Sequence, residues 1–391
     1  MRVAAIRVIQ VRIPLKKRIR HASHSRTEND TVLVRCQLED GTVGWGEGLP
    51  RAYVTGETIE TAWQHLQDYP YATLGQKVDS LASLADLVTG LSFSRPRETR
   101  ECFGNAARCA LELALLDAGC RGLGVPVSSF LEELSVAQGM TRSPVPVDYS
   151  AVLTASSLSR MCCRSLLYRY YGFRQCKVKV GMTGSDARKL LMLIHRLMGS
   201  RAALRVDANE AWTSQNIAKR LAALNAIPLQ SVEQPVPHAE VECLRDVRRQ
   251  IVLPIMLDES LCSKADADRA IEGELCDAFN LRLSKCGGIV PCVLLMQQAR
   301  RAGLFCQLGC QVGETGILSA AGRHFAGTMS GLTAVEGSFD RLLVREPLTE
   351  EDLTFGRGGL GKPLPGIGLG ITIQQAALQR VTVQSKEFSV S

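Results

Sequence analysis

Charged residues recur at the ends of short apolar runs between Gln175 and Lys285. The runs read QCKVKV, LRVDANE, SVEQP, PIMLDES and NLRLSKCGG, and a helix-like segment separates each run from the next, as in successive βα units. The strands of a βα barrel direct their last residues to one mouth, where such barrels hold their active sites. We therefore expect six charged side chains to converge on one cavity: Lys177, Lys179, Asp207, Glu233, Asp258 and Lys285.

The acidic and basic members of this set suit different chemistry. Three carboxylates suit a hard divalent cation such as Mg²⁺. Because side chains alternate along a strand, Lys177 and Lys179 share one face, as Asp207 and Asn209 do. A neighbouring like charge and burial both lower the pKa of a lysine, so one of the pair can act as a base. A solvated strand end or an ion pair would explain any one of these charges, but their recurrence over five units favours a catalytic centre.

Composition limits the classes of partner. A chain of 391 residues suggests about two domains, and its net charge of +7 is modest. One basic cluster, from Lys16 to Arg20, lacks the aromatic residues and motifs of nucleic-acid binding. We expect no nucleic-acid partner, and interpret this charge as a solvated face or as positive potential for an anionic substrate.

The 14 cysteines fit a reducing compartment. We expect no signal peptide, because Met1 leads directly into an amphipathic strand, and no apolar run is long enough to span a bilayer. Most cysteines lie within apolar stretches, and none has zinc-ligand spacing. We expect a cytoplasmic protein with reduced, buried cysteines and no membrane partner.

Three segments are expected along the chain. Residues 1–135 form an α+β domain: strands over 2–14 and 31–38, a turn at Asp40-Gly41, and a strong amphipathic helix that begins at Asn105. Residues 136–345 carry the βα repeat, and residues 346–391 return across the first domain. The polar stretches Lys16–Asp30 and Gly46–Glu57 are expected to be loops that close over the barrel mouth.

The motifs KVK, DAN, VEQP, DES and KCGG, in this order, resemble the muconate-lactonising subgroup of the enolase superfamily. The resemblance extends to GWGE in the first segment and to the helix ARCALELALLD. It implies a modified (β/α)₇β TIM-type barrel with an α+β capping domain. It also implies abstraction of a proton α to a carboxylate through a metal-stabilised enediolate, a small-molecule carboxylate substrate, and a homo-oligomer.

The resemblance also implies roles for individual residues. Asp207, Glu233 and Asp258 would bind Mg²⁺, with Mn²⁺ as an alternative, and Asn209 and Glu259 would orient these ligands. Lys179 and Lys285 would stand on opposite faces of the substrate, with Lys177 helping Lys179 to lose its proton. Candidate substrate contacts are His24, Tyr53, Gln311, Glu314, Glu336 and Ser338.

Three features differ from the dipeptide epimerases of this subgroup. Those enzymes carry a D-x-D motif after the last barrel strand, where this chain has Glu336-Gly337-Ser338. Some have an arginine in the first capping loop, where His24 aligns. The segment that ends in Glu314 is also one residue longer.

These observations leave several functions open. We put cycloisomerisation of a muconate-like acid first, and racemisation or epimerisation of a dipeptide or N-acylamino acid second. Dehydration of the o-succinylbenzoate synthase type, a lyase reaction, follows. An inactive barrel that serves as a binding protein is the non-enzymatic alternative, and the complete set of carboxylates and lysines argues against it.

Overall fold

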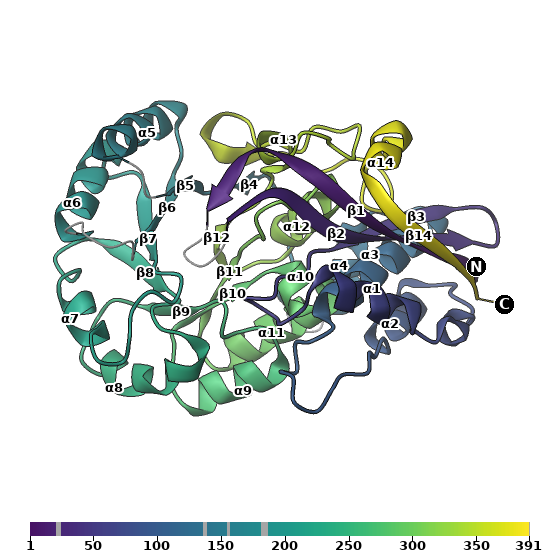
Figure 1. Cartoon of the computed structure of the whole chain (residues 1–391), viewed down its shortest axis with the longest axis horizontal. Helices are drawn as coiled ribbons and strands as arrows, with labels where there is room; N and C mark the ends of the chain where they lie inside the picture. The colour runs from purple at the N-terminus through teal and green to yellow at the C-terminus, as the bar shows by residue number, and fades with distance from the viewer. Residues whose placement is uncertain (21–24, 136–138, 155–156, 181–186, 391) are drawn as a thin grey trace.

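The computed structural model describes residues 1–20, 25–135, 139–154, 157–180 and 187–390. Figure 1 shows a βα barrel on one side and a sheet-and-helix domain on the other, where both termini lie. This arrangement confirms the predicted TIM-type barrel with an α+β capping domain.

The barrel is built from eight parallel strands within the described residues. In sheet order they are β5 (Ala151–Leu153), β6 (Gln175–Lys179), β7 (Ala203–Asp207), β8 (Leu229–Glu233), β9 (Ile255–Leu257), β10 (Ala278–Leu281), β11 (Phe305–Leu308) and β12 (Leu332–Val335). A parallel bridge between Tyr149 and Val335, with Ser150 N donating to Val335 O at 2.8 Å, brings the two ends of this sheet together.

Helices alternate with these strands and cover the outside of the barrel (Figure 1). They are α5 (Leu158–Tyr171), α6 (Ala187–Met198), α7 (Ile217–Ala222), α8 (Leu244–Arg248), α9 (Lys264–Glu272), α11 (Ile289–Arg301) and α12 (Gly316–Thr328). A short additional helix, α10 (Leu283–Cys286), begins two residues after β10 ends.

The capping domain contains an antiparallel sheet in the order β14-β1-β2-β3. Its strands are β1 (Val3–Arg20), β2 (Ser25–Leu38), β3 (Val43–Gly48) and β14 (Thr382–Ser389), so the C-terminal tail pairs with the first strand. The helices of this domain are α1 (Ile59–Gln67), α2 (Leu81–Thr89), α3 (Asn105–Gly122), α4 (Val127–Ser135) and, in the tail, α14 (Gln375–Val381).

Glycines let β3 lie directly against α3. Gly44, Gly46 and Gly48 alternate along the strand and therefore share one face. A Cβ atom at Gly46 would lie 2.0 Å from Ala110 O, a distance that no side chain tolerates. The GWGEG motif thus allows close contact between a strand and a helix.

The two polar stretches differ from our expectation. β1 extends to Arg20 and β2 begins at Ser25, so most of Lys16–Asp30 is a hairpin arm and not a loop. Arg12 pairs across the strands with Asp30, at 2.8 Å between Nε and Oδ1. This arm extends beyond the core and is stabilised by backbone pairing. Its strands therefore need no alternation of apolar and polar residues. Gly46–Gly48 likewise belongs to β3, so only the later part of the second stretch is a loop.

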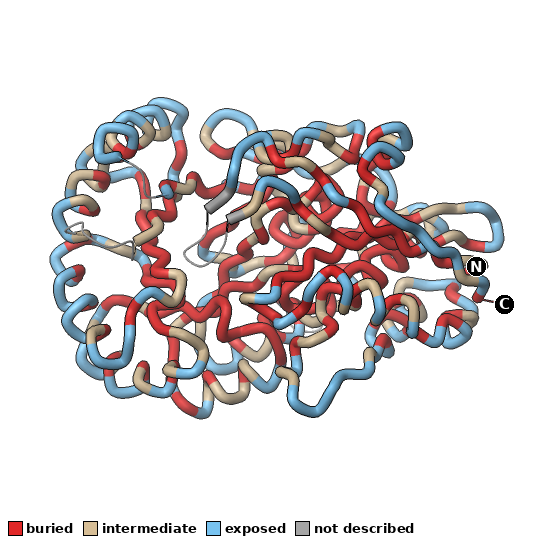
Figure 2. Tube along the Cα trace, viewed as in Figure 1, coloured by how far each residue is buried: buried red, intermediate tan, exposed pale blue. Residues whose placement is uncertain are grey.

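Buried residues form a continuous core through the barrel and the capping domain, as the red segments in Figure 2 show. Contacts join the two parts directly: Leu49 N donates to Ser284 Oγ at 2.7 Å, and Asn105 Nδ2 donates to Lys285 O at 2.7 Å. Within the described residues, none of the helices is both long and apolar enough to cross a membrane.

Candidate active site

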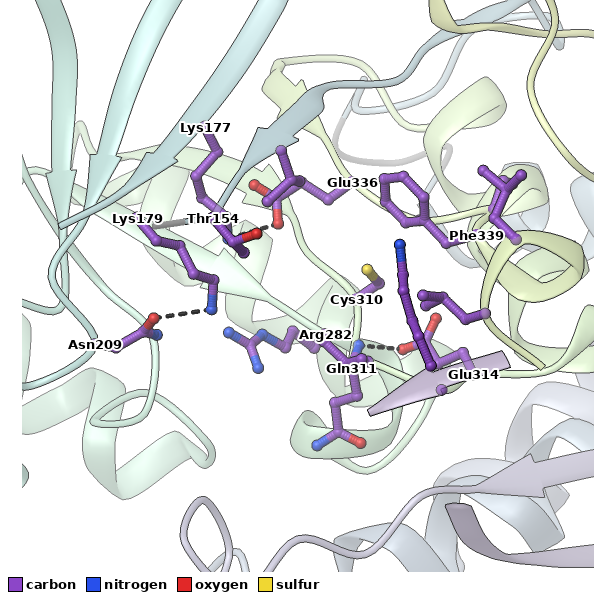
Figure 3. A pocket seen from close by; sticks show the side chains of 18 of the residues that line it. Thr154, Lys177, Lys179, Asn209, Arg282, Cys310, Gln311, Glu314, Glu336 and Phe339 are labelled. Atoms are coloured by element: carbon purple, nitrogen blue, oxygen red, sulfur yellow. Dashed lines mark hydrogen bonds and ion pairs between the residues drawn. The ribbon is translucent and has the colours of Figure 1, made fainter. Parts of the chain in front are cut away.

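A cavity of about 390 Å³ opens at the C-terminal ends of the barrel strands. Its barrel wall includes Lys177, Lys179, Asn209, Glu259, Arg282, Cys310, Gln311, Glu314, Glu336 and Ser338, and the capping domain adds Lys17, Arg26 and Tyr53. Figure 3 shows many of these side chains directed into the pocket. Backbone strain accumulates at this mouth, since Asn209, Gln234 and Ser338 have positive φ values of 44°, 36° and 57°.

Lys177 is enclosed by carboxylates. Its Nζ lies 2.6 Å from Glu336 Oε2, 3.3 Å from Glu233 Oε1 and 3.5 Å from Asp207 Oδ2. Burial alone would lower the pKa of this lysine, but the nearby carboxylates outweigh burial and raise it. Lys177 therefore stays charged at neutral pH.

Lys179 is the more open of the two lysines, with 26% of its side chain exposed. Its Nζ donates to Asn209 Oδ1 at 2.8 Å and lies 3.7 Å from Asp207 Oδ2 (Figure 3). The side chain is thus fixed by a hydrogen bond and a weak ion pair while it faces the cavity.

The predicted metal ligands are fully buried at the ends of adjacent strands. Glu233 accepts hydrogen bonds from Asn280 Nδ2 at 2.9 Å and from Gln307 Nε2 at 3.2 Å. Burial would raise the pKa of Glu233, but Lys177 and Arg282 outweigh it and hold the pKa at about 2. Glu233 is therefore ionised over the whole working pH range.

The carboxylates fit a divalent cation in donor type and charge. Asp207 Oδ2 and Glu259 Oε2 are buried, and neither has a hydrogen-bond partner among the residues that the structure describes. Burial and the nearby charge of Glu233 raise the pKa of Asp207, while burial and then Asp207 are the main causes that raise the pKa of Glu259 to about 8. Such mutual repulsion is what a bound cation would relieve. In the described part of the chain, however, no three His, Cys, Asp or Glu side chains lie together as a metal-binding group.

Asp258 is one reason why the three predicted ligands do not form such a group, because both of its carboxylate oxygens are bound to cationic side chains. Lys285 Nζ donates to Oδ1 at 2.9 Å, and the Arg282 guanidinium contacts Oδ2. Asp258 faces these two cations, whereas we expected it to turn toward Asp207 and Glu233.

Lys285 does not reach the cavity, which corrects our placement of it. The residue lies in α10, beyond the end of β10, and its side chain is 0% exposed. Its Nζ also donates to Asp258 O at 2.7 Å and to Asn280 O at 2.7 Å, so all three ammonium protons are used within the protein. Such contacts hold the β9 and β10 ends together.

Arg282 takes the place on the wall that we assigned to Lys285. It directly follows β10 and lines the cavity, and its NH2 group lies 3.9 Å from Glu233 Oε1. Sequence reasoning missed this residue although the signal was present. Side chains alternate along a strand, so Asn280 and Arg282, two residues apart, point to the same face. Lys285, three residues after Arg282, would point to the other face.

The remaining predicted residues divide into three groups. Tyr53, Gln311 and Glu314 line the cavity, and Gln311 N donates to Glu314 Oε1 at 2.6 Å. Glu336 and Ser338 also line it but have partners: Arg205 NH2 donates to Glu336 Oε1 at 3.0 Å, and Arg323 NH2 donates to Ser338 Oγ at 2.8 Å. His24 falls outside the described residues.

The fold and the site together define a class of enzymes, in which an α+β domain caps a barrel with acidic and basic residues at its mouth. Sequence comparisons identify the family. A model of the mandelate racemase / muconate lactonizing enzyme N-terminal domain matches residues 3–131. A model described as enolase C-terminal domain-like matches residues 162–377. The chain therefore belongs to the enolase superfamily, in its muconate-lactonising group, as the motifs predicted.

Characterised relatives cover almost the whole chain. An N-succinyl-L-Arg/Lys racemase from Bacillus cereus is 29% identical over 98% of both chains. The solved structure of N-succinyl Arg/Lys racemase from that organism superposes with a TM-score of 0.85 and covers 99% of this chain and 100% of that one. Muconate cycloisomerase 1 from Rhodococcus opacus is 28% identical over 95% of both chains.

A third relative was crystallised with a metal and a dipeptide. The structure of a dipeptide epimerase from Enterococcus faecalis, complexed with Mg and L-Leu-L-Tyr, is 26% identical and has a TM-score of 0.81. It covers 95% of this chain and 100% of that chain. These relatives identify the protein as an isomerase of the superfamily. They favour the racemase and epimerase alternative over the cycloisomerase that we put first, and they give the binding-protein alternative no support.

Proposed function

We propose that the protein removes the proton α to the carboxylate of an N-acylamino acid or a related dicarboxylate, with Lys179 as the base. The observation that carries this proposal is the position of Lys179, whose Nζ faces the cavity while Asn209 holds it at 2.8 Å. Lys177 and Lys285, the other lysines of the predicted set, are instead held by carboxylates or carbonyl groups.

Mg²⁺ is the proposed cofactor, with Mn²⁺ as an alternative, and Asp207, Glu233 and Asp258 would hold it. A bound cation would offset the negative charge that develops on the substrate carboxylate as the α-proton leaves. Asn209 supports this ligand set, because its backbone N donates to Asp207 Oδ1 at 2.9 Å and its Nδ2 lies 3.5 Å from Glu259 Oε1.

Gln311 favours a substrate that contains an amide. Its side chain is 97% buried at the cavity wall, with a relative exposure of 3%, and neither its Oε1 nor its Nε2 has a hydrogen-bond partner within the described residues. Leaving a buried donor and acceptor unpaired is costly. An N-acyl group offers a partner for one of them, since its N–H can donate to Oε1 or its C=O can accept from Nε2.

The charge of the wall favours a dianion over a zwitterionic dipeptide. Lysines and arginines outnumber the carboxylates among the described lining residues: Lys17, Arg26, Arg164, Lys177, Lys179 and Arg282 against Glu259, Glu314 and Glu336. Glu336, a candidate substrate contact, is already paired with Lys177 and Arg205. An N-acyl group that ends in a carboxylate, as N-succinyl does, suits this surplus of positive charge.

Deuterium exchange tests the proposal. The protein is incubated with Mg²⁺ in D₂O, near neutral pH, with N-succinylamino acids, unmodified dipeptides and cis,cis-muconate, and loss of the substrate C–H signals is followed by proton NMR. N-succinylamino acids should exchange, and Lys179→Ala should reduce exchange by about 10²–10⁴-fold. Unchanged exchange in that variant would contradict Lys179 as the base, and faster exchange of dipeptides would contradict the dianion preference.

Two net reactions share this step. Racemisation or epimerisation is the reaction of most of the relatives described above, and it calls for proton transfer on both faces of the α-carbon. Cycloisomerisation of a dicarboxylate needs one base only, and a specific observation favours it: Arg282, not Lys285, stands across the cavity from Lys179.

A further inference from the structure

The two sides of the cavity present different chemistry. Lys179 ends β6 and Arg282 follows β10, and β7, β8 and β9 lie between these strands in the sheet. In a closed eight-stranded barrel this separation places the two residues across the mouth from one another. Figure 3 shows the Arg282 guanidinium directed toward Lys179 and Asn209 from the other side of the pocket.

We propose that the site is one-sided: Lys179 exchanges a proton on one face of the substrate, and Arg282 gives the opposite face a fixed positive charge and no base. The inference rests on the proton abstraction proposed above. It goes further because it specifies the stereochemical course. A guanidinium group stays protonated in proteins and offers donors only, whereas a lysine amine can accept a proton once it is neutral.

The Arg282 side chain is largely buried at the cavity wall. Its guanidinium contacts Asp258, and its side chain is only 11% exposed. Its Nε is buried without a hydrogen-bond partner in the described part of the chain. The guanidinium charge can stabilise a substrate oxygen that gains negative charge, and burial makes this electrostatic interaction stronger than it is in water.

The other titratable groups on this side do not replace a lysine. Burial raises the pKa of Glu314 to about 8, so its carboxyl group holds a proton at neutral pH and does not serve as a base. Burial raises the pKa of the Cys310 thiol as well, so no thiolate is present. Lys285 is fully buried, and its three ammonium protons are used in bonds to Asp258 and Asn280.

The step balances with Lys179 alone. The neutral Lys179 amine takes the α-proton, the C–H bond breaks, and its electron pair moves into the carboxylate to give an enediolate. The resulting ammonium group carries the proton, which exchanges with solvent or returns to carbon on the same face. A substrate whose α-proton points toward Arg282 is not deprotonated, so the wild type does not invert the α-carbon.

The two enantiomers of N-succinyl-leucine test this inference by proton NMR in D₂O with Mg²⁺. The wild type should exchange the α-proton of one enantiomer without inversion and leave the other unchanged. Arg282→Lys should gain exchange of the second enantiomer by on the order of 10-fold or more, because it supplies a base on that face. Arg282→Met should show no such gain, and Lys179→Ala should lose exchange of the first enantiomer.

A matched control separates this gain from a general effect of arginine replacement. Arg26→Lys changes another arginine of the cavity wall and should not add exchange of the second enantiomer. Inversion by the wild type would overturn the inference while the proposed function stands, and it would point to Glu314 as the second acid or base. An Arg282→Lys protein that still exchanges the first enantiomer and gains nothing on the second would also overturn it. If the wild type exchanges neither enantiomer nor any acid of the larger panel, the proposed function fails with it.

Discussion

At the scale of single residues, the site depends on how each charge is paired. Lys177, Lys179 and Lys285 have similar intrinsic chemistry, yet only Lys179 is both fixed and exposed to the cavity. Lys177 neutralises a cluster of buried carboxylates, and Lys285 links two strand ends. Their different surroundings lead to different expected effects of mutation.

Replacing Lys285 should reduce stability before it affects chemistry. Lys285→Met would leave Asp258 Oδ1 and two buried carbonyl groups without their donor, which should cost about 3–5 kcal/mol in the free energy of unfolding. Lys179→Met is the matched control, because that side chain is 26% exposed and should cost much less. Urea denaturation measures both, and equal losses would contradict the structural role of Lys285.

Asp207 should govern metal affinity. Asp207→Asn removes one proposed anionic ligand and should weaken Mg²⁺ binding, as measured by calorimetry. Loss of a residue that only hydrogen-bonds to a metal ligand lowers metal affinity by roughly 10–100-fold, and loss of a ligand itself should lower it by more. Glu210→Gln is the control, since the Glu210 carboxylate accepts from His238 N at 3.2 Å and lies outside the proposed set. Unchanged affinity in the Asp207 variant would show that the cation binds elsewhere.

At the scale of elements, buried carboxylates fix the ends of helices across the two domains. Glu47 lies on β3 of the capping domain and caps α12 of the barrel. It accepts from Thr315 N at 3.0 Å, from Thr315 Oγ1 at 2.7 Å and from Leu318 N at 3.1 Å. The cap satisfies donors that a helix N-terminus leaves free, and it thereby joins the domains.

This cap makes stability depend on pH. Burial raises the pKa of Glu47 from 4.5 to about 7, so between these values the folded protein holds a proton that the unfolded chain has lost. Rising pH therefore favours unfolding across this window, by on the order of 3 kcal/mol, and has no further effect through Glu47 above it. In Glu47→Gln this component disappears.

Urea denaturation from pH 4.5 to 8 measures the difference between the wild type and Glu47→Gln. The exposed Glu39 provides the control, because Glu39→Gln should leave the pH dependence of the wild type unchanged. Parallel stability curves for the wild type and Glu47→Gln would contradict the prediction.

At the scale of the whole molecule, one core runs through both domains. Val8 and Val34 of the capping sheet belong to the same cluster of buried residues as Val206 and Leu281 of the barrel. Contacts such as Arg100 NH2 to Asp266 Oδ2 at 3.0 Å add polar links between the two parts. The homo-oligomer implied by the family resemblance remains a prediction.

A shared core predicts cooperative unfolding. Trp45 and Trp63 lie in the capping domain and Trp212 lies in the barrel, so each part can be followed by fluorescence. A Trp45→Phe/Trp63→Phe protein reports the barrel, and a Trp212→Phe protein reports the capping domain. Their urea midpoints should each coincide with the midpoint from circular dichroism of the same variant. Separate transitions within one variant would show that the domains unfold independently.

The class of fold and part of the cavity wall could be predicted from the sequence. Apolar runs with a charge at the end specify parallel strands, and alternation along each strand predicted that Lys179 and Asn209 share one mouth, where they are hydrogen-bonded. Long polar strands such as residues 16–20 were missed, because backbone pairing needs no apolar pattern.

Which charged side chains face the cavity depends on the tertiary structure. β10 ends at Leu281, so the chain turns into α10 and carries Lys285 into the interior, while Arg282 keeps the inward parity of Asn280. Pairing is likewise nonlocal: Lys177 meets Glu336 from a strand more than 150 residues away, at 2.6 Å. A charge on a strand end becomes a base, a ligand or a structural ion according to which distant residues the closed barrel brings beside it, and spacing along one strand does not contain that information.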